Sequence, residues 1–313
     1  MKKPGKTGPW KLLCIDLMLA SVLLLTFAYF DHVRPDTSVD EQPGMIISGD
    51  EDSSFSVDFS SRFPDVFTDG EIVEDQYSYR SANVSVTFDE LVVEVEKGKA
   101  VCYLFDIYVR SPEFFRTSLL DNTLHGGYYH RIDTLTHARN NDAIMAINGD
   151  YCVARDQGIV VRNGVLYRTE PFEDILVMYT NGTMKTFEEG DYDDIDFSEE
   201  NVWQVWSFGP ALLDNGQPKT RFDSTVSKSN PRSAVGYYEP GHYCIVAVDG
   251  RDMGGSEGMT LRELAQFFHE LGCEEAYNLD GGKTSVAVFG DRVVNIPYSG
   301  GRDCSDIIYI PRG

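Results

Sequence analysis

The sequence predicts a strand-rich mixed α/β (α+β) domain that follows an N-terminal membrane-spanning helix. Residues 12–30 are almost wholly apolar. From residue 76 onward, short apolar stretches alternate with turn sequences such as Asn-Gly and Asp-Gly, and two stretches read as helices. The 313 residues are 42% hydrophobic and 12% aromatic, which is the composition of a folded protein and not of a disordered or collagen-like chain.

The first element is the apolar stretch 12–30, with Lys2, Lys3, Lys6 and Lys11 before it. At ~1.5 Å per residue it spans ~28 Å, about one bilayer core. The bulky aromatics at its end favour an uncleaved signal-anchor over a cleaved signal peptide. A buried core helix fits the adjacent lysines poorly. We expect residues 1–11 to be a cytoplasmic basic tail, and the protein to be a single-pass protein of the cell membrane with its folded domain extracellular.

Residues 31–75 are rich in acids and serine without sustained periodicity, and they predict an acidic tether before one domain at 76–313. The formal charge is −23 overall. Beyond residue 30 the chain carries 23 basic and 49 acidic side chains, or −26. An excess of lysine and arginine holds phosphate backbones, so this charge argues against a nucleic-acid partner but leaves room for a local anion site.

The elements of the domain follow from periodicity and turn residues. Residues 84–95 and 100–109 predict a β-hairpin around the turn 96–99, and residues 133–140 predict a helix. Further strands are predicted at 143–147, 158–161, 165–167, 175–179 and 183–187, with Asn163-Gly164 and Asn181-Gly182 as hairpin turns.

The second half begins with strands at 234–238 and 243–249. Residues 260–271 predict a helix, because Thr260 and Glu263 form a capping box and an apolar stripe ends at Gly272. The last predicted strands are 275–279, 285–289 and 307–310.

Three predicted strands end in a polar group followed by glycine, at 147–150, 248–251 and 279–282. Side chains at such positions project from the edge of a sheet, and glycine lets a ligand approach the backbone closely. Each motif alone also reads as an ordinary turn. Three together predict a site, with candidates Asn148, Asp150, Asp249, Arg251, Asp280, Gly281 and Gly282.

Arg232 adds a cation where the segment 230–234 enters an apolar strand. A buried guanidinium is costly unless it pairs with an acid or binds an anion. Arg232 is therefore either part of an anion site or a structural partner of Asp249 or Asp280.

Five cysteines follow the apolar span: Cys102, Cys152, Cys244, Cys273 and Cys304. An oxidising compartment permits disulfides. We predict a Cys152–Cys304 bridge, because Cys152 follows the strand end at 147–150 and Cys304 precedes the last strand, which would put both on the same rim. Two free thiols are the alternative. No C-x-x-C pair supports a zinc ribbon, so the identity of any metal stays open.

The motifs resemble the phosphodiester glycosidase family, to which a eukaryotic N-acetylglucosamine-1-phosphodiester alpha-N-acetylglucosaminidase and bacterial exopolysaccharide biosynthesis proteins belong. The resemblance covers about residues 80–313 and is carried by blocks at 148–151, 209–213, 230–234, 248–251, 258–265, 271–282 and 295–297. The family commonly continues Asp-Gly-Gly with glycine and serine, whereas this chain has Lys283 and Thr284. We expect this difference to alter the pocket for the sugar or the leaving phosphate.

The resemblance implies an enzyme that hydrolyses a sugar-1-phosphodiester at the anomeric carbon, on a cell-envelope or exopolysaccharide glycan. The reaction needs a carboxylate to activate water or attack carbon, and a cation on the phosphate. Asp249 or Asp280 takes the first role, and Arg232 and Arg251 take the second. Expected substrate-binding residues are Asn148, Asp150, Asn278, Gly281, Gly282 and Lys283. No cofactor is expected, although a divalent cation fits the acids.

Two other classes of function remain open. A metal-dependent phosphodiesterase could use Asp150, Asp249 and Asp280 as ligands. A non-catalytic protein that binds envelope glycan would use the same surface without turnover.

Overall fold

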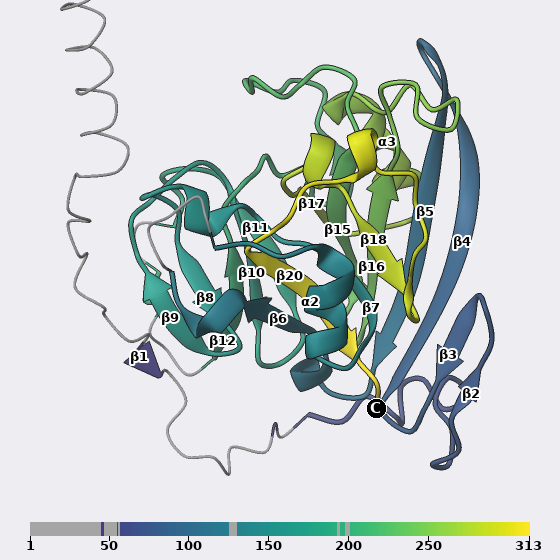
Figure 1. Cartoon of the computed structure of the whole chain (residues 1–313). Helices are drawn as coiled ribbons and strands as arrows, with labels where there is room; N and C mark the ends of the chain where they lie inside the picture. The colour runs from purple at the N-terminus through teal and green to yellow at the C-terminus, as the bar shows by residue number, and fades with distance from the viewer. Residues whose placement is uncertain (1–44, 47–54, 56, 125–129, 193–194, 198–200) are drawn as a thin grey trace, which may run out of the picture. The chain divides into compact units, whose positions relative to one another are not determined.

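The computed structural model describes residues 45–46, 55, 57–124, 130–192, 195–197 and 201–313. Figure 1 shows the arrangement of the elements. The elements are β1 Met45–Ile46, β2 Val73–Glu74, β3 Ser78–Arg80, β4 Val84–Val95, β5 Gly98–Val109, η2 Pro112–Phe114, β6 Arg116–Leu119, η3 Leu120–Asn122, α2 Thr134–Asn140, β7 Ala143–Asn148, η4 Cys152–Ala154, β8 Val160–Arg162, β9 Val165–Arg168, β10 Ile175–Tyr179, β11 Met184–Phe187, β12 Val202–Trp206, β13 Leu213–Asp214, β14 Gln217–Pro218, β15 Arg232–Glu239, β16 His242–Val248, α3 Leu261–Glu270, β17 Glu275–Asn278, η5 Gly282–Thr284, β18 Ala287–Phe289, β19 Arg292–Val293, η6 Tyr298–Gly300 and β20 Asp306–Pro311.

The largest sheet has seven strands in the order β17-β15-β16-β5-β4-β3-β2. Its two longest strands, β4 and β5, form the predicted hairpin and pair from Val84 with Val109 to Val95 with Gly98. All strand pairs within the described residues are antiparallel. Strands β16 and β17 therefore end beside the start of β15, which brings two of the polar strand ends to one edge.

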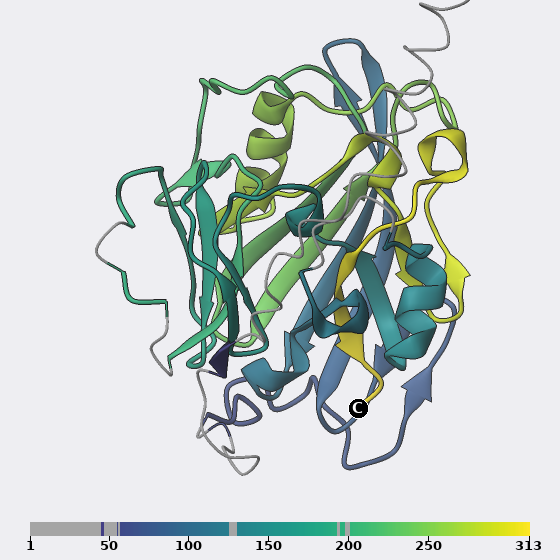
Figure 2. The same cartoon turned by 60° about the vertical axis from the view of Figure 1, so that its left-hand side comes forward.

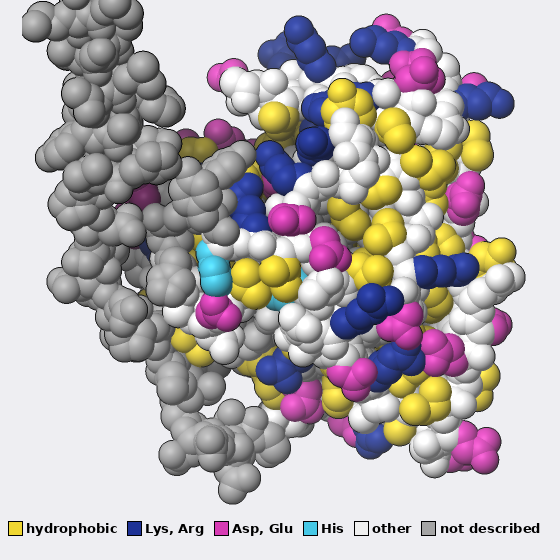
Figure 3. All heavy atoms as spheres, viewed as in Figure 1, with side chains coloured by type: hydrophobic (Ala, Val, Ile, Leu, Met, Phe, Trp, Pro, Cys, Tyr) yellow, Lys and Arg dark blue, Asp and Glu magenta, His cyan; other side chains and the backbone are white. Residues whose placement is uncertain are grey.

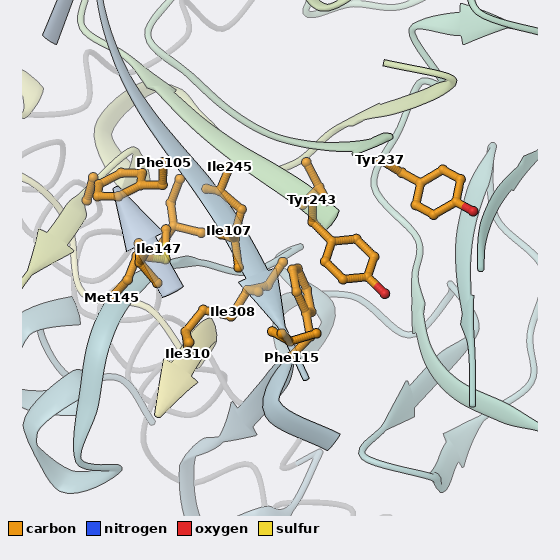
Figure 4. Packing of buried hydrophobic residues seen from close by; sticks show 14 of the residues in the cluster. Phe105, Ile107, Phe115, Met145, Ile147, Tyr237, Tyr243, Ile245, Ile308 and Ile310 are labelled. Atoms are coloured by element: carbon orange, nitrogen blue, oxygen red, sulfur yellow. The ribbon is translucent and has the colours of Figure 1, made fainter. Parts of the chain in front are cut away.

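A five-stranded sheet, β19-β18-β7-β20-β6, packs against one face of the seven-stranded sheet. Alternate residues of each strand fill the space between them. Figure 4 shows Phe105, Ile107 and Ile245 of the large sheet facing Ile147 and Ile308 of the smaller one. This shared core holds the ends of β7 and β17 close together.

Each helix covers the outer face of one of these sheets. Helix α3 packs on the seven-stranded sheet through Leu261, Leu264 and Phe268, and the predicted capping box of Thr260 and Glu263 is present. Helix α2 packs on the five-stranded sheet, as seen beside β7 in Figure 1. The predicted strand-rich mixed domain is confirmed.

A third sheet, β1-β9-β8-β12-β10-β11, has its own apolar cluster (Figure 2). Its hairpins turn at the predicted Asn163-Gly164 and Asn181-Gly182, and Asn163 has the left-handed φ of 51° that such turns need. Strand β12 was not predicted, because Val202–Trp206 is buried at every position and carries no alternation.

The N-terminal boundary of the folded unit differs from the sequence prediction. Residues 57–75, expected in the tether, include the buried Phe59 and strand β2, which pairs with β3. Within the described residues no helix has the length and apolar composition to cross a membrane. The predicted anchor at 12–30 and the basic tail lie outside the described residues.

Candidate active site

The ends of β7 and β17 are joined by one buried side chain, Asn148. Its amide Nδ2 donates to the carbonyl oxygen of Asp280 at 2.6 Å and to that of Gly149 at 3.0 Å. Its Oδ1 accepts from the Ser233 hydroxyl at 2.7 Å. Ser233 also lies 3.0 Å from the Ser285 hydroxyl, which donates to the carbonyl of Arg232. Asn148 is 0% exposed, so it positions the Asp280 turn and does not face solvent.

A small pocket opens beside this junction, and three aspartates line it. Asp280 follows β17, Asp303 precedes β20 and Asp306 begins β20. The rest of the lining comes from Arg131, Gly149, Tyr151, Thr284, Arg302, Cys304 and Ser305. The enclosed space is about 10 Å³, room for about one water-sized group. This is far below the roughly 300–1,000 Å³ of ordinary ligand clefts, so a ligand would reach into it with a small group only.

Two guanidinium groups flank the pocket. Arg302 Nη2 donates to Asp280 Oδ2 at 2.9 Å and also to the Thr284 hydroxyl. Arg302 and Arg131 each lie over the Tyr151 ring, at 5.4 and 5.3 Å from its centroid. Figure 3 shows Lys and Arg side chains gathered at the upper left of the described surface, where the chain runs toward β20. At the pocket itself, the guanidinium groups of Arg131 and Arg302 lie among three aspartates.

Asp280 is 9% exposed, and its carboxyl group is shielded from bulk water. Burial raises its pKa above the usual range, while the hydrogen bond from Thr284 and the charge of Arg302 oppose that shift. A carboxyl group in this position can exchange a proton and still be held in place by Arg302.

Asp306 belongs to a buried group that the sequence did not reveal. Arg162 Nη2 lies 2.7 Å from Asp150 Oδ1 and 3.4 Å from Asp306 Oδ2. Burial alone would raise the pKa of Asp150, but the charges of Arg162 and Arg155 and the Ser207 N–H outweigh it and lower that pKa. Burial and the nearby charge of Asp150 raise the pKa of Asp306 to about 7, against the charge of Arg162. The positive charge of Arg162 therefore compensates only one of the two carboxyl groups, that of Asp150.

Gly149 is required by this arrangement. A Cβ built there would lie 1.8 Å from Asp306 Oδ2, so the carboxyl group packs directly on the backbone. In the Asn-Gly-Asp motif at 148–150, Asn148 therefore links two strand ends, and Gly149 leaves room for the Asp306 carboxyl group. Asp150 supplies a buried charge beneath the pocket.

Three predicted catalytic residues, Asp249, Arg232 and Arg251, lie outside the pocket wall. Asp249 accepts hydrogen bonds from the Tyr103 hydroxyl, the Asn295 amide and the Ile296 N–H, and burial raises its pKa. Arg232 is 3% exposed and donates to the carbonyls of Val226, Lys228 and Met259, where burial lowers its pKa to about 10. Asp249 and Arg232 hold loops in place, and Arg232 pairs with neither Asp249 nor Asp280.

The remaining predicted residues lie close to the pocket or beneath it. Arg251 is exposed, donates to Asn230 Oδ1 at 3.0 Å and lies 4.7 Å from the Tyr298 ring centroid. A Cβ at Gly282 would be 3.3 Å from its guanidinium. Lys283 is exposed next to Thr284 of the pocket.

Two further predicted residues have mainly backbone roles. Asn278 is buried and donates to the carbonyl of Gly209, away from any sugar. At Gly281 a Cβ would meet the Pro231 carbonyl at 2.6 Å.

The predicted Cys152–Cys304 disulfide is wrong in this structure, where both are free buried thiols. They pack in different apolar clusters, and Cys304 Sγ instead lies 3.5 Å from the Thr134 hydroxyl. Asp150, Cys152 and Asp306 form the one group within the described residues with the spacing of metal ligands. Arg162 already compensates one of those two acids, and the alternative ligand Asp249 does not join them.

The pocket residues that sequence reasoning missed are Arg131, Tyr151, Arg302 and Asp306. Asp306 carried a signal, since it is an acid that opens an apolar strand. Tyr151 has a left-handed φ of 66°, which no sequence pattern revealed.

Carboxyl and guanidinium groups around one pocket are typical of hydrolases that act on anionic substrates. Residues 141–311 match the family model of phosphodiester glycosidases. This is more than half of the chain, and the chain belongs to the phosphodiester glycosidase family. The resemblance read from the motifs is confirmed.

The chain is also similar to individual proteins in sequence or in fold. The chain is 28% identical over 193 residues to protein YomE of the SPbeta prophage of Bacillus subtilis, covering 58% of this chain but 30% of that protein. The catalytic domain of zebrafish N-acetylglucosamine-1-phosphodiester alpha-N-acetylglucosaminidase has the same fold, with a TM-score of 0.60, 22% identity and 78% and 88% of the two chains covered. A Synechocystis protein aligns with a TM-score of 0.50 and 16% identity over 73% and 62%.

Proposed function

We propose that this protein hydrolyses a sugar-1-phosphodiester at the anomeric carbon, on a cell-envelope or exopolysaccharide glycan. The observation that carries the proposal is the pocket in which Asp280 and Asp306 lie beside Arg302 and Arg131. Membership of the phosphodiester glycosidase family supports it, and the zebrafish relative is named for hydrolysis of this kind of bond.

The pocket suits the demands of that reaction. A phosphomonoester is a good leaving group, so the bond to carbon needs little protonation from an acid. Arg302 and Arg131 neutralise the phosphate, and a guanidinium can hold two phosphate oxygens at once. Asp280 is the carboxylate that activates water or attacks the anomeric carbon. Arg251 and Lys283, next to the pocket wall, contact the part of the diester that extends beyond it.

The setting of the enzyme is also a proposal. An anchor at residues 12–30 would tether the domain to the outside of the cell membrane, next to the glycans of the envelope. A carbohydrate-phosphate is then the partner of the pocket, the membrane is the partner of the N-terminal segment, and no nucleic acid is involved.

The test is product analysis with the purified full chain. Incubated with a GlcNAc-1-phosphodiester, it should release free sugar and a phosphomonoester. Release of sugar 1-phosphate would instead mean that the P–O bond is cleaved. If a chelator then abolished the release of sugar 1-phosphate, the protein would be a metal-dependent phosphodiesterase. Asp280→Asn should abolish turnover. If wild-type protein and variant bind the diester equally and neither releases product, the protein is a glycan-binding module.

A further inference from the structure

Cys244 and Cys273 bring their sulfur atoms together on the helix side of the large sheet. Cys244 lies in β16, and Cys273 follows α3, where its N–H donates to the Phe268 carbonyl at 3.1 Å. The two Sγ atoms are 3.7 Å apart. The residues are 0% and 2% exposed, so the pair is enclosed by the protein.

The strand between them leaves the space that this contact needs. Gly236 of β15 pairs with Cys244 on one side and with Ala276 of β17 on the other. A Cβ at Gly236 would lie 2.6 Å from Cys244 Sγ and 2.8 Å from Cys273 Sγ. Any residue other than glycine would therefore push the sulfurs apart, and the two thiols meet directly over the backbone of β15.

We propose that Cys244 and Cys273 are a disulfide-forming pair, which links β16 to the end of α3 across β15 when the chain meets a disulfide oxidant. A disulfide is ~2.05 Å long, so the sulfurs must approach by ~1.6 Å, a distance that side-chain rotation and a small shift of the 271–274 turn can supply. The proposal does not depend on the enzymatic activity.

The bond forms by two thiol–disulfide exchanges with an oxidant such as oxidised glutathione. The Cys273 thiolate attacks one sulfur of oxidised glutathione and releases one glutathione. The Cys244 thiolate then attacks the Cys273 sulfur of the mixed disulfide and releases the second. The two protein thiols lose two protons and two electrons, and one oxidised glutathione becomes two reduced molecules.

Burial decides when this can occur. It raises the pKa of Cys244 well above the usual range, and it keeps solutes away from both sulfurs. Oxidation therefore takes place while the chain folds or when the 271–274 turn opens. Once formed, the disulfide is equally shielded from reductants.

The experiment uses the full chain, refolded from denaturant with either oxidised or reduced glutathione. Each protein is then denatured without reductant, alkylated and digested with trypsin. Cleavage after lysine and arginine puts Cys244 in peptide 233–251 and Cys273 in peptide 263–283, each with one cysteine. We expect alkylation of both to fall at least about tenfold in the oxidised sample, with one cross-linked peptide pair, while the peptides of Cys102, Cys152 and Cys304 stay alkylated.

Two variants complete the design. In Cys244→Ser, the cross-linked peptide pair should disappear, and the peptide of Cys273 should be either alkylated or joined to one glutathione. The matched control, Cys304→Ser, should keep the cross-link. Equal alkylation of all six cysteines in oxidised wild-type protein, or a cross-link from either residue to another cysteine, would overturn the proposal.

Discussion

The side-chain amide of Asn148 donates to the backbone carbonyl of Asp280 across 2.6 Å. These two residues end strands of different sheets, so this hydrogen bond joins the layers at the pocket. Ser233 donates to the other end of the same amide. A buried amide with every atom engaged restricts where the carboxyl group of Asp280 can lie.

Asn148→Ala should therefore destabilise the fold and reduce activity together. It leaves the Asp280 carbonyl and the Ser233 hydroxyl without this partner in a buried setting, which costs about 2 to 3 kcal/mol of unfolding free energy. Urea denaturation measures the loss. Asn140→Ala, at an exposed residue of α2, is the control and should stay within about 0.5 kcal/mol of wild type. Equal stabilities of the two variants would contradict the linking role.

The sequence predicted the elements better than it predicted the directions of their side chains. The hairpin of β4 and β5 and helix α3 followed from periodicity and capping. The sequence favoured an anion site for Arg232 because this residue begins an apolar strand close to the polar motifs. Successive residues of a strand point to opposite faces, so Ser233 faces Asn148 while Arg232 lies on the helix side.

The pocket residues were missed for a different physical reason. Arg131 precedes α2, and Arg302 and Asp306 lie near the end of the chain, so only the packing of the two sheets brings them to Asp280. No local pattern encodes such a long-range contact. The glycines of the motifs were found, but Gly149 serves the carboxyl group of Asp306 and not a ligand.

Arg302→Ala should lower kcat/KM on a sugar-1-phosphodiester by at least about 100-fold, or ~2.7 kcal/mol, because it removes both the partner of Asp280 and a phosphate-binding group. Arg302→Lys should recover little, since an ammonium group lacks the paired donors of guanidinium. Arg292→Ala, at an exposed residue that does not line the pocket and donates to the Gln76 carbonyl, is the control with unchanged kinetics. Near-normal turnover of Arg302→Ala would remove this residue from the site.

Arg232→Ala should act mainly on stability. The change leaves three backbone carbonyls without their donor and opens a cavity, which costs about 3 kcal/mol or more. Thermal unfolding should shift to lower temperature, and the fraction that remains folded should bind substrate with an unchanged KM. A stable variant that has lost activity would instead return Arg232 to the catalytic group.

The N-terminal segment gives a prediction about topology. Lys2, Lys3, Lys6 and Lys11 before the apolar stretch predict that residues 31–313 lie outside the cell. Protease added to intact cells or spheroplasts should digest this part of the chain, while a cytoplasmic marker protein survives. Full protection of the folded domain would contradict the predicted orientation.

The pKa of Asp306 predicts how stability depends on pH. Its folded value of about 7 lies above the usual 3.8, so between roughly pH 4 and 7 the folded chain keeps a proton that the unfolded chain has released. The free energy of unfolding contributed by Asp306 therefore falls as the pH rises through this window. The lowered pKa of Asp150 affects stability only at more acidic pH, below this window.

Asp306→Asn resembles the protonated acid, so its urea midpoint should fall less between pH 5 and pH 8 than that of wild type. Asp291→Asn, at an exposed acid, is the control and should follow wild type. Equal decreases for Asp306→Asn and wild type would show that Asp306 ionises normally and that Arg162 compensates both carboxylates.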